Sequence, residues 1–287
     1  MGNVIIIGSG PAGISAALYT ARAGIRTTVI GKGAGALEKA EKIENYYGFP
    51  EPVPGRELIE NGIAQARRVG AEILAEEAVG LGYTDKLTVK TTSGEYSADC
   101  VIIATGSSRK APKIKGLLEY EGSGVSYCAV CDAYFHRGKD VAVLGCCEYA
   151  IAEAMELLPV ASSVTIVTNG DEPSPKIPQG IKVVTAEVEE LLGNQALEAI
   201  AFKDGTKLPV SGVFVAIGVA GSSELARKMG AEINGNAIAV DSHMATSIPG
   251  LYAAGDCTGG MLQISKAVYQ GAVAGTEAVK YIRNMSK

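Results

Sequence analysis

The pair Cys128-x-x-Cys131, followed directly by Asp132, is the part of this sequence whose residue types and spacing most clearly suggest chemistry. Two cysteines at this spacing can close a small disulfide, and the spacing lowers the thiolate pKa, above all at a helix N-terminus. The Asp132 carboxyl group could move protons as the disulfide opens and closes. Zinc sites use the same spacing but need two more ligands, and the sequence offers neither a second Cys-x-x-Cys nor histidines at ligand spacing. The pair therefore predicts redox chemistry and no metal site.

A strand, a glycine-rich turn and a helix open the chain. Residues 4–13 read Val-Ile-Ile-Ile-Gly-Ser-Gly-Pro-Ala-Gly, and an apolar helix continues to about Gly24. In this setting Gly8 makes the tight turn, Gly10 lets the backbone approach a pyrophosphate, and Gly13 permits close packing of the helix. The helix N-terminus then faces the phosphates. An ordinary glycine-rich turn is the simpler alternative, but the order of the three elements favours a dinucleotide site.

The second strand leaves the identity of the dinucleotide open. It spans residues 26–30, and an NAD site would place an acidic residue for the ribose about 20 residues beyond the glycine-rich turn. Gly31 and Lys32 stand there instead. This departure weakens an NAD site and leaves flavin adenine dinucleotide (FAD) as a candidate.

Two later segments fit FAD. Residues 99–106 read as a buried strand ending in Ala-Thr-Gly, and residues 250–256 as another strand ending in Gly-Asp. The carboxylate of Asp256 could accept hydrogen bonds from a ribityl hydroxyl. A helix predicted from about Gln263 to Arg283 would turn its N-terminus toward the electron-rich edge of a flavin ring. Each segment alone reads as a structural turn, but their order together favours a flavin site.

The composition excludes several other classes of protein. The 287 residues suffice for two domains with their own cores, and the 36 glycines suit an α/β protein with many tight turns. A net charge of −5 argues against a nucleic acid partner, and no apolar run approaches a membrane span. The six cysteines lack the spacing of a secreted disulfide framework, and the strand from Asn3 leaves no room for a signal peptide. We therefore expect a cytoplasmic protein.

Taken together, these motifs resemble those of the low-molecular-weight thioredoxin reductases. The resemblance covers essentially the whole chain in unbroken order, and it rests on Gly8–Gly13, Ala104–Gly106, Cys128–Asp132, and Gly255-Asp256 with Gln263. It implies an α/β fold of two doubly wound, Rossmann-like domains. Residues 1–111 and 241–287 would form a discontinuous FAD-binding domain, and residues 112–240 an inserted redox domain. The family also implies a homodimer.

The same resemblance assigns roles to individual residues. It implies that Cys131 lies against the isoalloxazine ring, that Cys128 exchanges with the disulfide of thioredoxin, and that Asp132 is the acid–base residue. FAD would be held by the glycine-rich turn, the strand ends and the loops beside them. The expected FAD contacts are Gly8, Gly10, Pro11, Ala12, Gly13, Gly31, Lys32, Leu37, Asn45, Val79, Ala104, Thr105, Gly106, Gly255, Asp256, Gln263 and Ile264.

The inserted domain departs from the family at its own dinucleotide turn. After a strand at 140–144, the turn reads Gly145-Cys146-Cys147-Glu148-Tyr149-Ala150. Cys147 stands in place of the second glycine, and its Cβ and sulfur would occupy the space that a pyrophosphate needs. Sequence drift around a working NADPH site is the alternative.

Residues 168–172, which follow the next strand of the inserted domain, also depart from the family pattern. NADPH-using relatives follow that strand with His-Arg-Arg and a further arginine, which hold the 2′-phosphate. Here the strand at 164–167 runs into Thr-Asn-Gly-Asp-Glu at 168–172, with two acids and no arginine. Like charge repels a phosphate, and bidentate recognition by arginine is missing. Val219-Ala220 also replaces the usual polar residue and proline after a later strand.

A flavin and a dithiol without a pyridine nucleotide need another electron source. The pattern is similar to that of the ferredoxin-dependent flavin thioredoxin reductases of anaerobic bacteria. A ferredoxin near roughly −400 mV reducing a thioredoxin near roughly −270 mV releases about 6 kcal/mol for two electrons. The sequence has no iron–sulfur spacing of its own, so the cluster would come with the partner. We therefore expect ferredoxin as the donor and thioredoxin as the acceptor.

Three other functions remain open from the sequence alone: an NADPH-dependent thioredoxin reductase with an atypical site, an FAD dithiol oxidase, and a non-enzymatic flavin redox sensor. Adjacent Cys146 and Cys147 could form a second redox pair, but their disulfide would close a strained ring. Cys100 and Cys257 read as small core residues. His136 and His243 read as structural or solvent-facing residues.

Overall fold

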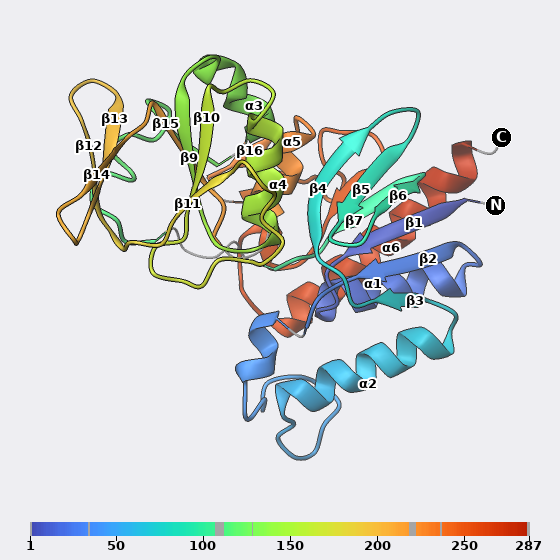
Figure 1. Cartoon of the computed structure of the whole chain (residues 1–287). Helices are drawn as coiled ribbons and strands as arrows, with labels where there is room; N and C mark the ends of the chain where they lie inside the picture. Colours follow the sequence, from blue (N-terminus) through green and yellow to red (C-terminus); the bar gives the residue numbers. More distant parts are fainter. Residues whose placement is uncertain are drawn as a thin grey trace. The chain divides into compact units, whose positions relative to one another are not determined.

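The structure, a computed structural model, describes residues 2–33, 35–106, 112–127, 129–217, 222–235 and 237–285 (Figure 1). Within these ranges it describes the backbone but not the side chains of Ala36, Lys39, Val130, Cys131 and Ser222. The chain forms two compact units. The first comprises Met1–Ser108 with Gly221–Lys287, and the second comprises Arg109–Ala220.

The first unit is built on a parallel sheet whose strands come from both ends of the chain. The sheet has five strands in the order β18-β7-β1-β2-β3. They are β1 (Asn3–Ile7), β2 (Arg26–Ile30), β3 (Glu72–Leu74), β7 (Cys100–Ile103) and β18 (Leu251–Ala253). Parallel strands need crossover connections that cover both faces, which explains why these short strands consist mostly of buried apolar residues.

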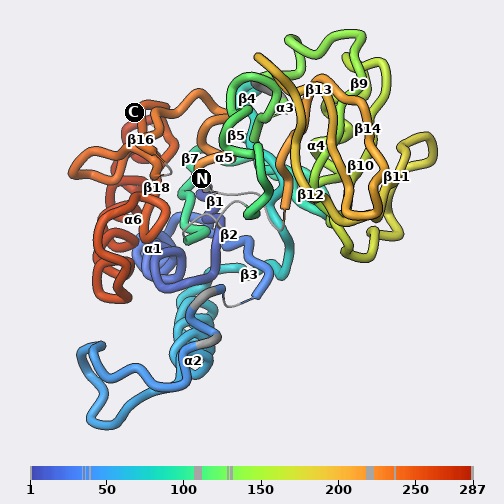
Figure 2. Tube along the Cα trace, turned by 90° about the vertical axis from the view of Figure 1, so that its left-hand side faces the viewer, coloured from blue at the N-terminus to red at the C-terminus, as the bar shows by residue number. Residues whose placement is uncertain are grey.

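Three long helices accompany this sheet, namely α1 (Pro11–Arg22), α2 (Gly55–Arg68) and α6 (Ile264–Met285). Figure 2 shows α6, near the C-terminus, lying beside α1, near the N-terminus. A Cβ atom on Gly271 would lie only 2.1 Å from the carbonyl oxygen of Ala12, so this close approach requires glycine. The remaining elements of the unit are η1 (Gly35–Lys39), β4 (Ala78–Tyr83), β5 (Leu87–Thr91), β6 (Glu95–Ala98), α5 (Ser222–Lys228), β16 (Ile233–Asn234), β17 (Ala237–Ile238) and η3 (Asp256–Thr258).

The second unit repeats the same architecture. Its parallel sheet has five strands in the order β11-β10-β9-β15-β8, and a three-stranded antiparallel sheet, β12-β13-β14, accompanies it. The elements are β8 (Val125–Ser126), α3 (Ala129–Asp132), η2 (Ala133–His136), β9 (Asp140–Leu144), α4 (Glu148–Leu157), β10 (Ser163–Val167), β11 (Lys182–Val184), β12 (Val188–Gly193), β13 (Leu197–Phe202), β14 (Lys207–Pro209) and β15 (Gly212–Val215). The predicted α/β fold class with two Rossmann-like domains is confirmed.

The structure divides the chain differently from the predicted domain boundaries. The predicted insertion continues to residue 240, whereas residues 222–240 belong to the first unit. The reason is packing, because α5 contacts β4 and β17 contacts η3 within that unit. The other predicted boundary, between 111 and 112, borders the segment 107–111, which lies outside the described residues.

Candidate active site

Two glycines of the first turn are required by the packing of the protein itself. The Gly8 amide donates a hydrogen bond to the Ile30 carbonyl at 2.8 Å. A Cβ atom on Gly8 would lie 2.2 Å from the Ala104 carbonyl oxygen, and one on Gly13 would lie 1.9 Å from the Gly8 carbonyl oxygen. No real Cβ atom approaches a carbonyl oxygen so closely, so both positions exclude any side chain.

Gly10 differs from these two, because the protein leaves open space beside it. It caps the N-terminus of α1 with extended backbone angles, φ −76° and ψ −176°, and a Cβ atom there would meet no atom within 4 Å. No side chain caps α1, and its first turn contains no acidic residue. The positive end of the helix and its amide groups therefore face open space, which suits a pyrophosphate. These residues fit the phosphates of FAD.

The carboxyl ends of the parallel strands bring other predicted contacts to the same edge of the sheet. Gly31 follows β2, and its Cβ atom would lie 2.6 Å from Ser9 Oγ. Gly255 follows β18, and its Cβ atom would lie 2.8 Å from the Cβ of Ala12. This is the edge where open α/β sheets bind their ligands. Predicted contacts that continue from these strand ends or from the start of α1 are Pro11, Lys32, Ala104, Thr105, Gly106 and Asp256.

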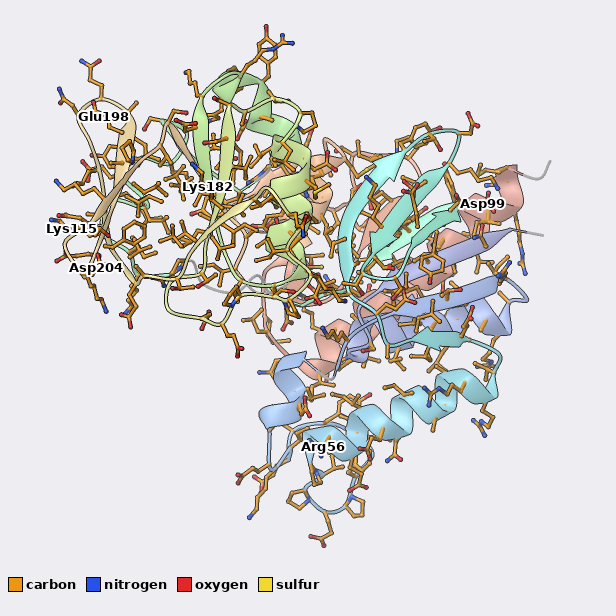
Figure 3. The ribbon with its side chains drawn as sticks, viewed as in Figure 1. Arg56, Asp99, Lys115, Lys182, Glu198 and Asp204 are labelled. Carbon is orange, nitrogen blue, oxygen red and sulfur yellow. The ribbon has the colours of Figure 1, made fainter. Side chains whose placement is uncertain are left out.

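A cavity of about 350 Å³ opens beside the first turn and collects further predicted residues. Gly10, Pro11, Leu37 and Ile264 all line it. Leu37 lies in η1. Arg56, which Figure 3 labels at the start of α2, forms an exposed ion pair with Glu38 Oε1 of η1 at 2.8 Å. The cavity therefore lies along the N-terminal part of α1, and η1, the loop at 46–49, α2 and α6 also line it.

Asn45 and Gln263 are 218 positions apart in sequence, yet the structure joins them. The Asn45 side-chain amide donates a hydrogen bond to Gln263 Oε1 at 3.0 Å. Val79 lies in a different place, half-buried in β4 of the antiparallel sheet, and Lys32 pairs with Glu77 at 3.8 Å. Neither Val79 nor Lys32 lines the cavity.

The dithiol segment is described only in part. Cys128 lies outside the described residues, and Cys131 lies within α3 without a described side chain. Beside them, Ser126 Oγ donates a hydrogen bond to Asp132 Oδ2 at 2.7 Å. The amide of Ala129, the first residue of α3, donates to Glu153 Oε2 at 2.7 Å. These two contacts fix both ends of α3.

Two residues of this site, Glu153 and Ser126, are not predicted from the sequence. Glu153 lies on the buried face of α4 and is only 1% exposed. A buried carboxylate needs hydrogen-bond donors, so an acid at a buried position of an otherwise apolar helix face is the signal that could find it. A two-residue strand just before the cysteines leaves no comparable signal for Ser126.

The second glycine-rich turn repeats the backbone of the first. A Cβ atom on Gly145 would lie 2.1 Å from the Ala216 carbonyl oxygen, so this glycine is again required by packing. Cys147 occupies the N-cap of α4 with φ −117° and ψ −174°. Unlike α1, helix α4 has an acid, Glu148, in its first turn. A carboxylate thus already lies at the positive end of this helix.

The segment after β10 folds back onto this second turn. The amide of Ser174 donates to the Cys146 carbonyl at 3.1 Å, and Cys146 Sγ donates to Asp171 Oδ2 at 3.6 Å. Lys176 Nζ lies 3.4 Å from the carboxylate of Glu148. Residues 171–176 therefore contact the turn where a pyrophosphate would lie.

Residues 169 and 170, where NADPH-using relatives carry arginines, serve the local fold instead. Asn169 has a φ of +54°, and its Oδ1 accepts a hydrogen bond from the Val188 amide at 2.7 Å. Gly170 has a φ of +90°, and a Cβ atom there would lie 3.0 Å from Glu187 Cγ. Neither position accommodates an arginine without strain.

The structure describes the other four cysteines as free thiols, and it also describes the surroundings of His136. Cys100 and Cys257 are buried as free thiols, and burial raises the pKa of Cys257 to about 12. Burial, followed by the nearby Cys147 and Asp171, raises the pKa of Cys146 to about 11. His136 is buried with Nδ1 3.1 Å from Ser211 Oγ, and burial lowers its pKa.

A family model described as pyridine nucleotide-disulphide oxidoreductase matches residues 2–271 of the chain. The chain belongs to this family. The resemblance drawn from the motifs is confirmed. Members of the pyridine nucleotide-disulphide oxidoreductase family are FAD-binding flavoproteins, so the predicted cofactor is confirmed as well.

Relatives within this family carry names that narrow the class further. The chain is 38% identical to the thioredoxin reductase of Aquifex aeolicus over 273 residues, which cover 88% of this chain and 84% of that protein. The atypical thioredoxin reductase TRi from Desulfovibrio vulgaris Hildenborough has a similar structure, with a TM-score of 0.95, 43% identity and 99% of both chains covered. The ferredoxin-flavin thioredoxin reductase from Clostridium acetobutylicum has a TM-score of 0.75 and 32% identity, with 100% of this chain and 99% of that chain covered. This member of the pyridine nucleotide-disulphide oxidoreductase family is thus a flavin disulfide oxidoreductase of the thioredoxin reductase type. Across the described part of the chain, no helix is both long and apolar enough to cross a membrane.

Proposed function

We propose that this chain reduces thioredoxin with electrons from ferredoxin rather than from NADPH, as a cytoplasmic homodimer. The similarity to proteins named thioredoxin reductase supports thioredoxin as the electron acceptor. The similarity to a ferredoxin-flavin thioredoxin reductase supports ferredoxin as the electron donor. The observation that carries the proposal is the second glycine-rich turn, Gly145–Ala150, which residues 171–176 of its own unit contact.

Steric and electrostatic effects both oppose a nucleotide at this turn. A pyrophosphate needs a position without a side chain, and Cys147 presents a Cβ and a sulfur there. It also needs a positive helix end, but Glu148 places a carboxylate in the first turn of α4. The carboxylate of Asp171 lies beside the same turn through its contact with Cys146. A doubly charged pyrophosphate would therefore meet two acids, only one of which pairs with a lysine in a described contact.

The first unit supplies what FAD needs. The Gly8–Gly13 turn would hold the pyrophosphate, Asp256 would accept from a ribityl hydroxyl, and the Asn45–Gln263 pair would contact the flavin. When bound, FAD can accept electrons singly and supply them as a pair, which suits a one-electron donor and a two-electron acceptor.

The dithiol completes the proposed reaction. Two electrons and two protons convert the Cys128–Cys131 disulfide to a dithiol. The Cys128 thiolate attacks the thioredoxin disulfide and forms a mixed disulfide, and one thioredoxin sulfur leaves as a thiolate that takes up a proton. The Cys131 thiolate then attacks the sulfur of Cys128 and restores the Cys128–Cys131 disulfide, and the second thioredoxin sulfur leaves as a thiolate that takes up the second proton. Asp132, held by Ser126, gives and takes the proton.

Anaerobic reduction of the flavin tests the donor. We expect reduced ferredoxin to bleach the flavin absorbance of the wild-type protein, more slowly at high salt if docking is electrostatic. We expect NADPH and NADH to leave it unchanged on the same time scale. Rapid, stoichiometric bleaching by NADPH would reject the proposal and return the chain to the NADPH-dependent reductases.

Two cysteine variants test the order of the thiols. The family resemblance implies that Cys131 is the thiol next to the flavin, so for Cys128→Ser we expect a long-wavelength charge-transfer band from the Cys131 thiolate. Cys131→Ser should show no such band. Both variants should retain FAD and lose thioredoxin reduction. Turnover by Cys128→Ser would contradict the assignment of Cys128 as the attacking thiol.

A further inference from the structure

Two side chains of α6 reach the turn that carries Asp256. Lys266 and Gln270 are four residues apart, so they lie on the same side of the helix, one turn above the other. The turn that they contact runs from Gly255 through η3 to Gly259. Both helix residues are half-buried.

Gln270 holds the beginning of this turn. Its Oε1 accepts one hydrogen bond from the Gly255 amide at 2.9 Å and another from the Thr258 hydroxyl at 3.0 Å. Gly255 has a φ of +88°, which gives this part of the backbone little conformational preference of its own. A fixed acceptor therefore selects one of several available conformations.

Lys266 holds the other side of the turn. Its ammonium group donates to the Gly255 carbonyl at 2.9 Å, to the Gly259 carbonyl, and to Thr258 Oγ1 at 3.4 Å. The ammonium group thus bridges the carbonyls of the residues before and after η3 with charge-assisted hydrogen bonds. Between them, Lys266 and Gln270 contact the residues on both sides of Asp256.

Helix α6 is itself fixed to the helix that begins at the pyrophosphate turn. Ser15 Oγ of α1 donates to the Val268 carbonyl at 2.7 Å. Cβ atoms on Gly271 and Gly275 would lie 2.1 Å and 2.7 Å from carbonyl oxygens of α1. The helices cannot move apart without breaking this packing. Because α6 contacts both the Asp256 turn and α1, it fixes the distance between Asp256 and the turn at Gly10.

We propose that Lys266 and Gln270 are positioning residues for FAD, which act by holding Asp256 in register with the pyrophosphate turn of α1. This inference rests on the proposed flavin contact of Asp256, and it is independent of whether ferredoxin or NADPH is the electron donor.

Titration of the full-length, flavin-free protein with FAD tests the proposal without any measurement of activity. We expect Lys266→Met and Gln270→Leu each to raise the dissociation constant for FAD about tenfold, equivalent to about 1.4 kcal/mol. Lys266→Arg and Gln270→Glu retain the donors and the acceptor, and they should recover most of the affinity. Lys280→Met is the matched control, because Lys280 lies on the same helix and is exposed, with Glu277 as its partner. It should bind FAD within about twofold of wild type.

A double variant separates positioning from a direct effect on FAD. If Lys266 acts through Asp256, then Lys266→Met should add less than about twofold to the loss already caused by Asp256→Ala. Fully additive losses would overturn the proposal, as would wild-type affinity in Lys266→Met. Circular dichroism of each flavin-free variant checks the fold, and if Lys266→Met does not fold, Gln270→Leu decides by the same criteria. Wild-type affinity in Asp256→Ala would instead reject the flavin contact on which the inference rests, and it would leave the donor proposal untouched.

Discussion

The two glycine-rich turns of this protein share a backbone but differ in the residues at their helix N-termini. In each, the first glycine lies against the carbonyl of the residue that follows a neighbouring strand, where a Cβ atom would approach to 2.2 Å at Gly8 and 2.1 Å at Gly145. In each, the residue at the helix N-cap is extended, with ψ −176° at Gly10 and −174° at Cys147. The two turns differ in the N-cap side chain, in the third position of the motif (Gly13 against Ala150), in the charge of the first helical turn and in the segment that contacts the turn.

The glycines of the two turns are needed for two different reasons. Gly8 and Gly145 are needed by the protein, since any side chain would collide with its backbone. Gly10 is not needed by the protein, because open space lies beside it. A glycine such as Gly10 is therefore explained by a ligand that needs the space. A turn that binds no ligand has no such need, so it can carry a cysteine at the matching position 147.

The largest expected effect comes from a valine at the two N-cap positions. The extended backbone of Gly10 accepts a β-branched residue, so Gly10→Val should fold, but its side chain would fill the place of the pyrophosphate. We expect complete loss of FAD, measured as the ratio of flavin absorbance to protein after purification. Cys147→Val is the matched variant and should retain FAD in full. Flavin retention by Gly10→Val would remove the distinction between the two turns.

A smaller effect, equal in both turns, is expected from alanine at the first glycine. Gly8→Ala and Gly145→Ala each drive a Cβ atom into a carbonyl oxygen, so each should lose about 3 kcal/mol of local stability. Amide hydrogen exchange can measure this in each unit separately, with faster exchange in α1 for the first variant and in α4 for the second. An effect at Gly8 alone would show that the second turn is not maintained by packing.

The smallest effect concerns the thiol of the second turn. Because burial, Cys147 and Asp171 raise the pKa of Cys146 to about 11, its reactive thiolate is scarce at neutral pH. At pH 8, iodoacetamide should label it on the order of a hundredfold more slowly than an unperturbed thiol, with the rate rising about tenfold per pH unit toward the pKa. Mass spectrometry of the reduced protein measures this rate. Asp171→Asn should speed the labelling, whereas fast labelling of the wild type would restore Cys146 as a redox candidate.

Local patterns were sufficient to predict the fold and the strand, turn and helix that open the chain. These patterns are a run of β-branched residues, glycines at fixed offsets and an apolar helix, and they involve only residues close together in sequence. The segments 99–106 and 250–256 also read as strands that end in small residues, and the carboxyl ends of these strands lie at one edge of the sheet. The motifs also predicted that the second turn departs from a nucleotide site, since one substitution there removes a glycine.

What the sequence did not predict depends on contacts between distant segments. The assignment of residues 222–240 to the first unit follows from packing of α5 on β4, more than a hundred positions away in sequence. The absence of arginine after β10 was visible, but not the hydrogen bond from Ser174 that brings this segment onto the turn. The joining of Asn45 to Gln263 likewise has no local signature.

The buried hydrogen bond between Glu153 and Ala129 limits how such a domain can evolve. Helix α4 carries Cys147 and Glu148 at its N-terminus, and its middle supports the first peptide of α3 through Glu153. A lineage that deleted α4 would leave that amide without its acceptor and the dithiol without its support. Mutations can therefore accumulate at the N-terminus of α4 while selection preserves the rest of the helix. An enzyme of this fold that changed its electron donor would still keep the whole second unit.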